Sequence, residues 1–147
     1  MASAIRLIVI FGVLNLIWEV LQLPFYTLWN MGTPGEIAYA VIHCTGGDVL
    51  IGVFVALIST TVLRAGLFQV RGSWQFPMLF IPFGLTYTIF SEWLNVSVVK
   101  GWAYSDLMPL IPPLGTGLTP TLQWVIVPLL TWVCLDQASR ARLAGRP

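Results

Sequence analysis

Four stretches of this chain are long and apolar enough to cross a lipid bilayer as helices, and they constrain the fold more than any other feature. They cover residues 5–29, 37–63, 76–96 and 118–135. A helix needs about 20 predominantly apolar residues to span the hydrocarbon core. Because backbone polar groups cannot stay unpaired in lipid, each stretch is predicted to be a helix. The first contains polar residues and is too long for the apolar part of a signal peptide, so we expect it to be retained.

The composition of the 147-residue chain agrees with a membrane protein. Hydrophobic residues make up 57% of the chain and charged residues only 9%, whereas about 25% of the residues of a soluble domain are charged. A net charge of +1 leaves too few basic residues for a nucleic-acid-binding surface. We therefore expect a single all-α integral membrane domain over residues 1–147, a four-helix transmembrane bundle that contacts membrane lipids and no nucleic acid.

The distribution of Lys and Arg predicts which side of the membrane each end faces. In a four-helix topology, six of the seven basic residues fall on one side, and Lys100 falls on the other. An excess of Lys and Arg in short loops marks the cytoplasmic side. Both termini, including a tail over residues 136–147, are therefore expected in the cytoplasm, and the protein in a bacterial cytoplasmic (inner) membrane. The six residues are Arg6, Arg64, Arg71, Arg140, Arg142 and Arg146.

The three connections between these stretches differ in character. Residues 30–36 contain Gly32-Thr33-Pro34-Gly35, which is typical of a plain turn, and residues 64–75 form a short basic loop. Residues 97–117 mix aromatic and aliphatic residues with three prolines. Trp and Tyr favour the membrane interface, and the prolines prevent a regular helix. This Pro-rich loop is therefore predicted to form a flap on the outer face.

Polar residues gather in the outer half of the predicted bundle, whereas the inner half is almost purely apolar. Ionisable residues inside a membrane span are costly and usually face the bundle interior, so each one is a candidate functional residue. Counting along the helices at about 1.5 Å per residue places four such residues in the outer half. These candidate catalytic residues are Glu19, His43, Asp48 and Glu92.

Helical spacing tests whether these residues share a face with other polar groups. On the first helix, polar residues recur at i, i+4, i+7 and i+11 and form one narrow stripe. On the second helix, Asp48 lies about 140° from His43 at 100° per residue, so either two sides of the helix are covered or Gly46-Gly47 distorts it. Those glycines also let helices approach closely. The predicted substrate-binding residues are Asn15, Trp18, Gln22, Tyr26, Tyr87, Asn95, Gln123 and Trp124.

Several kinds of chemistry lack their characteristic residues in this chain. A zinc site needs three or four ligands at set spacing, and the chain has a single histidine. Paired Glu-x-x-His motifs for a di-iron site, nucleotide-binding glycine motifs and hydrolase nucleophile motifs do not occur. We therefore expect no metal and no cofactor. General acid–base chemistry on an apolar molecule remains open.

Each ionisable residue also has a structural interpretation. Glu19 with Gln22 would join helices by hydrogen bonds, and a lone histidine such as His43 is often a satisfied structural residue. Asp48 would be kept neutral by small polar neighbours on its own helix. Glu92, near the end of its helix, would be solvated. The spacing alone leaves both interpretations open for each residue.

Three short stretches resemble parts of two families of membrane enzymes. Asn15-Leu16-Ile17-Trp18-Glu19 is similar to the N-x-x-W-E stretch of the small membrane terpene cyclases of fungal meroterpenoid pathways. It also resembles the His-x-x-x-Glu helix of emopamil-binding-type sterol isomerases, with Asn15 in the place of the histidine. Tyr87-Thr88-Ile89-Phe90-Ser91-Glu92 is similar to the aromatic-rich stretch of the isomerases that ends in Thr-Glu, and Gln123-Trp124-Val125-Ile126-Val127-Pro128 to their Trp-x-x-x-Pro on the last helix. The Trp-Glu and His-Cys-Thr-Gly-Gly-Asp segments are also similar to those of many small bacterial polytopic membrane proteins.

The resemblance implies a specific kind of chemistry. In both enzyme families a carboxylic acid in an apolar pocket protonates an alkene or epoxide, and carbonyl-like or aromatic groups stabilise the cation. An isomerase or cyclase acting on a lipid-soluble, isoprenoid-like substrate would follow. Glu19 would donate the proton and His43 or Glu92 would accept one, between the helices in the outer leaflet. Trp18 and Trp124 would face the cation with their rings.

A second class of function stays open. A non-catalytic subunit would pack its apolar faces against a larger membrane complex or a further copy of itself, and the polar residues would then join its helices. A small oligomeric transporter is a third interpretation. The apolar inner half disfavours it, because no continuous polar path crosses the bundle.

Overall fold

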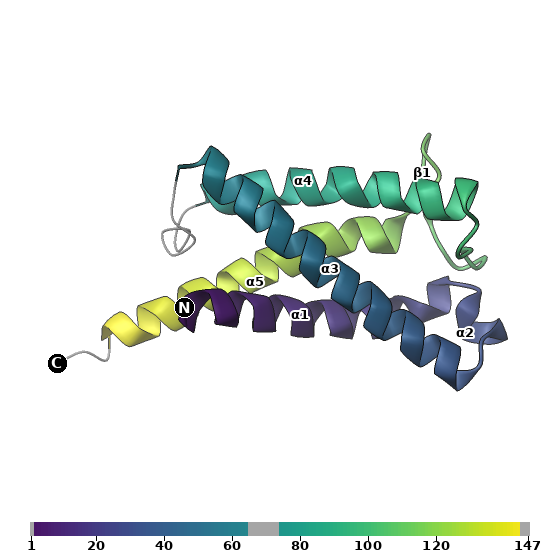
Figure 1. Cartoon of the computed structure of the whole chain (residues 1–147), viewed down its shortest axis with the longest axis horizontal. Coiled ribbons are helices and arrows are strands. Elements are labelled where there is room, and N and C mark those ends of the chain that lie inside the picture. The colour runs from purple at the N-terminus through teal and green to yellow at the C-terminus, as the bar shows by residue number, and fades with distance from the viewer. Residues whose placement is uncertain (1, 65–73, 145–147) are drawn as a thin grey trace.

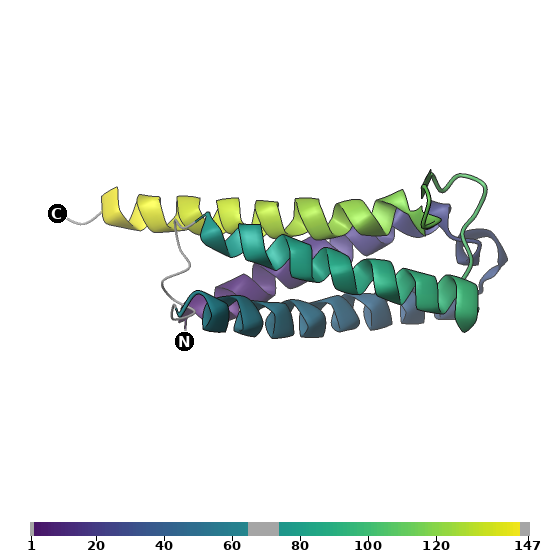
Figure 2. The ribbon, with the colours of Figure 1, turned by 90° about the horizontal axis from the view of Figure 1, so that it is seen from above.

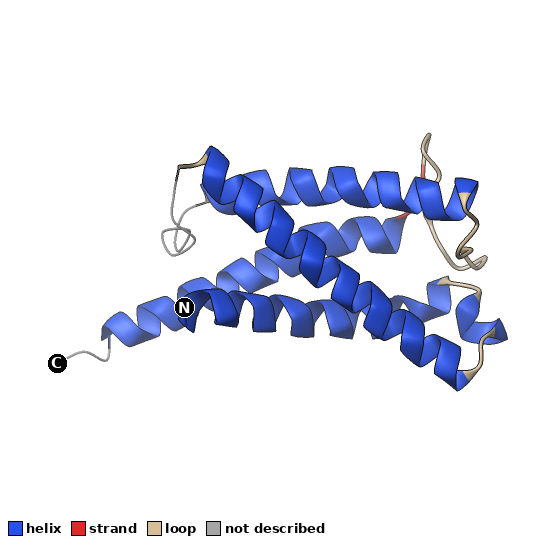
Figure 3. Ribbon diagram, in the orientation of Figure 1, coloured by secondary structure: helices blue, strands red, loops and turns tan. Residues whose placement is uncertain are grey.

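The protein is almost entirely helical in its computed structural model, which describes residues 2–64 and 74–144 (Figure 1; Figure 3). The prediction of an α-helical chain is confirmed, and the described residues add one small β-hairpin made of two strands of two residues each. The longer helices are α1 (Ala2–Gln22), α3 (Pro34–Val62), α4 (Gln75–Glu92) and α5 (Leu118–Ala144). The short elements are the 3-10 helix η1 (Leu23–Phe25), α2 (Leu28–Met31), the π-helix η2 (Trp93–Val98), β1 (Leu110–Ile111) and β2 (Thr116–Gly117).

Three helical segments are long and apolar enough to cross a membrane. They are Ile5–Phe25, Pro34–Val62 and Leu118–Gln137. Among the described residues α4 does not join them, because its second half carries several hydroxyl groups and ends on Glu92. The helix lengths and composition are those of a membrane protein.

The four long helices lie side by side (Figure 1; Figure 2). α1 packs against α3 and α5, and α4 packs against the same two helices. The bundle is therefore a closed ring in the order α1, α3, α4, α5. Its apolar centre is aromatic: the Phe11 ring meets the rings of Phe80 and Trp124 edge-on, at centroid distances of 5.8 and 6.0 Å.

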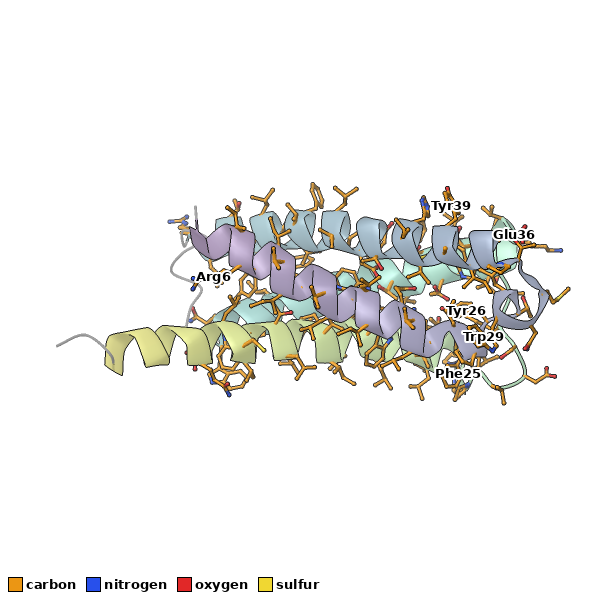
Figure 4. All side chains as sticks on the ribbon, turned by 90° about the horizontal axis from the view of Figure 1, so that it is seen from below. Arg6, Phe25, Tyr26, Trp29, Glu36 and Tyr39 are labelled. Carbon is orange, nitrogen blue, oxygen red and sulfur yellow. The ribbon has the colours of Figure 1, made fainter. Side chains whose placement is uncertain are left out.

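The two ends of the bundle carry different parts of the chain. At one end, the terminal end, lie the start of α1, the end of α3, the start of α4 and the last turns of α5 (Figure 1). At the other, the loop end, lie α2 and the segment after α4. Arg6 is at the terminal end, opposite Phe25, Trp29 and Glu36 (Figure 4). Arg71, Arg146 and most of the predicted basic loop lie outside the described residues.

α3 begins at Pro34, three residues before the predicted start, because a capping box closes its first turn. The Thr33 hydroxyl accepts a hydrogen bond from the Glu36 backbone N–H at 3.3 Å, and the Glu36 carboxylate accepts one from the Thr33 N–H at 2.8 Å. Proline fits the first helical position, where its missing N–H would have had no partner. Residues 30–36 are thus not a plain turn: α2 and the first turn of α3 occupy most of them.

The later helices also end differently from the prediction. α4 changes into the π-helix η2, which ends at Val98, and Lys100 follows in the left-handed region, with φ 55°. The Gly101 N–H donates to the Asn95 carbonyl at 2.8 Å and closes that end. α5 continues to Ala144, so residues 136–144, predicted as a tail, are helical.

Close contacts between helices are made at glycines other than Gly46 and Gly47. A Cβ atom at Gly52 would overlap the Phe11 ring, and one at Gly84 would overlap the Trp124 ring. At Gly46 and Gly47 a Cβ atom would meet nothing within 4 Å. The prediction that Gly46-Gly47 allows close approach is therefore wrong within this chain, because Gly46 is exposed and Gly47 borders a cavity.

The segment after α4 folds back over the loop end. Its backbone pairs with the segment that follows α1: the Thr27 N–H donates to the Ala103 carbonyl at 3.0 Å, and the Ser105 N–H to the Phe25 carbonyl at 2.9 Å. β1 and β2 then form an antiparallel hairpin, with Gly115 at φ 68° in its turn. This segment therefore lies as an ordered cover on the end of the bundle that holds the polar residues.

Candidate functional site

Five polar side chains from three helices meet inside the bundle, nearer its loop end. Four of them are less than one-tenth exposed, and the fifth, Asp48, is half-buried. Helical periodicity brings the α1 residues to one face, as the sequence predicts. The members of this polar cluster are Asn15, Glu19 and Gln22 on α1, Asp48 on α3 and Gln123 on α5.

Gln123 is the centre of the polar cluster. Its Nε2 lies 2.9 Å from Asn15 Oδ1, 3.0 Å from Glu19 Oε1 and 2.8 Å from Asp48 Oδ2. A carboxamide carries two N–H donors, so these three acceptors share them. Gln123 therefore connects α5 with α1 and α3 at the same point.

Glu19 and Asp48 form a carboxyl pair at this point. Both accept a hydrogen bond from the same nitrogen, Gln123 Nε2, at 3.0 and 2.8 Å. Two ionised carboxylates this close repel each other, which favours a proton on one of the two groups. Gln22 Nε2 donates to Glu19 Oε1 at 2.9 Å. The pair is thus held in place by carboxamides on two helices.

A cavity of about 320 Å³ adjoins the polar cluster. This volume lies within the range of small-molecule sites, roughly 300–1,000 Å³. Its walls come from all four long helices and from the segment after α4. Ten of the twelve predicted site residues line it: Glu19, Gln22, Tyr26, His43, Asp48, Tyr87, Glu92, Asn95, Gln123 and Trp124.

The remaining two predicted residues, Asn15 and Trp18, are not among those lining the cavity. The Asn15 amide nitrogen donates to the Phe11 carbonyl at 2.8 Å, and its oxygen accepts from Gln123. The indole N–H of Trp18 donates to the Thr119 carbonyl at 3.2 Å. Both side chains link α1 with α5 instead.

Asp48 and His43 occupy different parts of α3. Asp48 is directed inward to Gln123, whereas His43 is exposed and stacks on the exposed Tyr39 ring at a centroid distance of 5.4 Å. The separation of about 140° around the helix axis therefore places Asp48 inside the bundle and His43 on its outside. His43 reaches the cavity only from the edge.

Glu92 is buried against the segment after α4. It is 7% exposed, so the prediction that it is solvated is wrong. The Tyr104 hydroxyl donates to the Glu92 carboxylate and accepts from the Gly117 N–H at 2.9 Å. Burial, reinforced by this hydrogen bond, raises the pKa of Tyr104 above its ordinary 10.0. Tyr104 therefore keeps its proton and its bond to Glu92 over the physiological range.

Tyr104 and Trp102 are the site residues that sequence reasoning missed. It placed the aromatic residues of this segment at the membrane interface, and their spacing from Glu92 follows no helical or strand period. Trp102 lines the cavity together with Glu92, and its buried indole N–H makes no hydrogen bond of acceptable geometry. The Tyr26 and Tyr104 backbones form an isolated antiparallel bridge, and their rings lie 5.6 Å apart.

Electrostatically, the cavity is acidic. Three carboxyl side chains line it, and no Lys or Arg side chain does within residues 5–64 and 74–137, whose side chains the structure describes. In the same part of the chain, no group of three or more His, Cys, Asp or Glu residues lies close enough to hold a metal ion. The arrangement offers acids, amides and aromatic rings to a bound molecule.

In comparisons with known proteins, the chain matches no family model, no curated protein and no solved structure. Its function is therefore argued from the geometry of the cavity.

Proposed function

We propose that this protein is an integral membrane protein whose cavity binds a lipid-soluble, isoprenoid-like molecule and transfers protons to and from it. The observation that carries the proposal is the carboxyl pair, Glu19 and Asp48, which share the Gln123 amide in the wall of a cavity between apolar helices. Ionisable groups inside a membrane bundle are costly and are kept for function. Two adjoining carboxyl groups that hold a proton are suited to general acid catalysis.

The proposed topology has four transmembrane helices, α1, α3, α4 and α5, with both termini in the cytoplasm of a bacterial cell. The support is the position of Arg6 at the terminal end and of Arg64 two residues after α3 ends there, where α5 also ends. Short segments rich in Lys and Arg stay on the cytoplasmic side. The cavity, nearer the loop end, would then open within the outer leaflet.

In the proposed reaction, the carboxyl pair supplies a proton to one carbon of a double bond. The π electrons form the new C–H bond and leave a cation on the neighbouring carbon. The carboxylate that remains on the pair is stabilised by the N–H groups of Gln22 and Gln123, which already point at it. No movement of these donors is needed when the charge appears.

Glu92 is the better placed base. It lies on α4, lines the same cavity and is held by Tyr104, whereas His43 is exposed at the edge. Its carboxylate would remove a proton from a carbon next to the cation and form a new double bond. One proton enters the substrate and one leaves, so the reaction is an isomerisation or cyclisation. A proton then returns from Glu92 to the carboxyl pair before the next turnover.

Aromatic rings in the cavity wall would stabilise the cation. Trp124 and Tyr26 both line the cavity, and the faces of such rings attract a cation by about 0.5–2 kcal/mol. The segment after α4 covers this end and would exclude water, which protects a cation from being quenched.

A second function, that of a non-catalytic subunit of a larger membrane complex, is favoured by one observation. Gln123 joins α1, α3 and α5 through a single amide, as a residue with a purely structural task would. Under this proposal Glu19 only helps to hold the helices together, and an amide would serve as well.

The substitution Glu19→Gln separates the two functions. An amide keeps the shape and hydrogen bonds of Glu19 but cannot donate the proton, so we expect turnover to fall by about 10²–10⁴-fold with the fold retained. Turnover is measured as deuterium uptake from D₂O into isoprenoid lipids by mass spectrometry. Glu36→Gln, at the exposed capping box away from the cavity, is the matched control and should remain active.

The opposite result would favour the structural function. A fully active Glu19→Gln protein ends the enzyme proposal. In that case a bulky residue at the exposed Gly46, where a side chain has open space around it, should disrupt the complex instead. Native mass spectrometry from mild detergent would show the lost partner.

A further inference from the structure

Two buried polar atoms in the cavity wall lack hydrogen-bond partners. They are Gln22 Oε1, an acceptor, and Trp102 Nε1, a donor. Leaving a buried polar group unpaired is costly, and nearly all such groups in native proteins have a partner. Their presence in one cavity therefore indicates what the bound molecule supplies.

The orientation of the Gln22 amide follows from its neighbours. Its Nε2 donates to Glu19 Oε1 at 2.9 Å and to Gln123 Oε1 at 3.3 Å, and both of those atoms are acceptors. Exchanging the nitrogen and oxygen of the amide would place three oxygens together. Gln22 itself is 6% exposed. Its oxygen thus remains a buried acceptor that only a donor inside the cavity can satisfy.

The unpaired donor lies at the same end of the cavity. Trp102 precedes Ala103, whose carbonyl is hydrogen-bonded to the Thr27 N–H just beyond α1. This bond holds the Trp102 segment against the end of α1 that carries Gln22. The indole N–H of Trp102 is buried in the same cavity wall as Glu92 and makes no hydrogen bond of acceptable geometry.

Charge restricts the class of molecule further. The lining residues include Glu19, Asp48 and Glu92 but, in the described chain, no Lys or Arg. A phosphate or carboxylate head group would lose its hydration and meet no compensating cation. An ammonium group would donate to Gln22 but would leave the Trp102 N–H without an acceptor.

We propose that the cavity binds a neutral lipid alcohol, whose hydroxyl donates to Gln22 Oε1 and accepts from Trp102 Nε1. A hydroxyl is the smallest group that both donates and accepts. The inference rests on the proposed function in one respect, namely that the cavity takes a lipid-soluble molecule. To the proposed function it adds that the head group of the ligand is a hydroxyl. Phosphorylated forms of the same lipid are therefore not expected to bind.

A series of probes with one common chain tests this head-group selectivity. The full-length protein in lipid nanodiscs is titrated with farnesol, farnesyl methyl ether, farnesylamine and farnesyl monophosphate, and empty nanodiscs correct for partitioning. The ether accepts a hydrogen bond but cannot donate one. We expect farnesol to bind about 3- to 10-fold more tightly than the ether, and both more tightly than the charged probes.

Two variants assign the selectivity to the two atoms. Gln22→Leu should reduce the farnesol-to-ether ratio of affinities to about one, whatever it does to overall affinity, because it removes the acceptor. Trp102→Phe should weaken farnesol and the ether by a similar factor, because both accept from the indole. Trp132→Phe is the matched control, since its buried N–H is also unpaired but lies outside the cavity lining. It should change neither affinity.

The outcomes separate this inference from the proposed function. Equal affinities for farnesol and its ether in the wild-type protein would overturn the inference, and so would tighter binding of the monophosphate or the amine. The proposed function would survive each of these results. Saturable binding of none of the four probes would overturn both.

Discussion

Tyr104 shows at the scale of one residue how a loop side chain completes a site inside the bundle. Its hydroxyl donates to Glu92 on α4 and accepts from the backbone of β2, and its own backbone is bridged to Tyr26 after α1. One residue, through its side chain and its backbone, therefore connects three other parts of the chain. Without it, the buried Glu92 carboxylate loses the hydroxyl donor that the structure gives it.

Tyr104→Phe should destabilise the protein by about 1.5–3 kcal/mol near pH 7, the typical worth of a hydrogen bond to a charged group. The pKa of Tyr104 is raised above 10.0 in the folded protein, mainly by burial. Its contribution is therefore fully present below pH 10 and is lost as the pH rises further, because the unfolded chain ionises first. Thermal unfolding in detergent at pH 7, 9 and 11 should show the difference between wild type and variant shrinking at the highest pH.

Tyr39→Phe serves as the control for this measurement. Tyr39 is 68% exposed and contacts only the ring of His43 among the interactions seen for it. Its loss should leave stability almost unchanged at every pH. A constant difference between Tyr104→Phe and wild type from pH 7 to 11 would contradict the assigned hydrogen bond.

At the scale of helices, two glycines determine how closely the ring of four can pack. Gly52 on α3 receives the Phe11 ring of α1, and Gly84 on α4 receives the Trp124 ring of α5. Small residues at such points let membrane helices approach closely. Trp124 also forms part of the cavity wall, so packing at Gly84 determines the shape of the site.

Gly84→Ala should destabilise the bundle by about 1–3 kcal/mol, the usual cost of an inserted methyl group in a packed core, and should weaken ligand binding by displacing Trp124. Gly46→Ala provides the control, because the new methyl group there meets nothing within 4 Å. Both substitutions gain similar helix propensity. The difference between their unfolding temperatures therefore measures the cost of the overlap with Trp124. Equal unfolding temperatures for the two variants would refute the contact.

At the scale of the whole molecule, the ends of the bundle differ in charge and in chemistry. Arg6 and Arg64 mark the terminal end, while the polar cluster and the cavity lie toward the loop end. Single-cysteine labelling in intact bacterial cells tests the proposed orientation, with Cys44 and Cys134 replaced. We expect an impermeant reagent to label Gly35→Cys and Asp106→Cys from outside, and Arg142→Cys only after the cells are opened. The reverse pattern would contradict the topology.

Local signals made much of this architecture predictable. The apolar stretches define the long helices, and the spacing on α1 places Asn15, Glu19 and Gln22 together. Thr33 and Glu36 form a capping box, whose spacing is visible in the sequence.

The contacts that sequence reasoning could not supply are non-local. Helical phase separates Asp48 from His43 but cannot say which of them faces inward, because that depends on where α5 lies. Gly46-Gly47 looks like a packing motif, yet the rings of Phe11 and Trp124 rest on other glycines. Tyr104 reaches Glu92 through a turn in the backbone that has no period to detect.

Gln123 is synthesised long after the residues on the first helix with which it pairs. The amide that satisfies Asn15 and Glu19 is synthesised more than a hundred residues after them, since it lies 108 residues beyond the first and 104 beyond the second. The nascent first helix therefore enters the bilayer with a carboxyl group and two amides whose main partner does not yet exist. Until the last helix arrives, these groups must be shielded by water, by the insertion machinery or by an early α1–α3 hairpin. A chain that stops before α5 keeps Asn15 and Glu19 but lacks the amide that pairs with them.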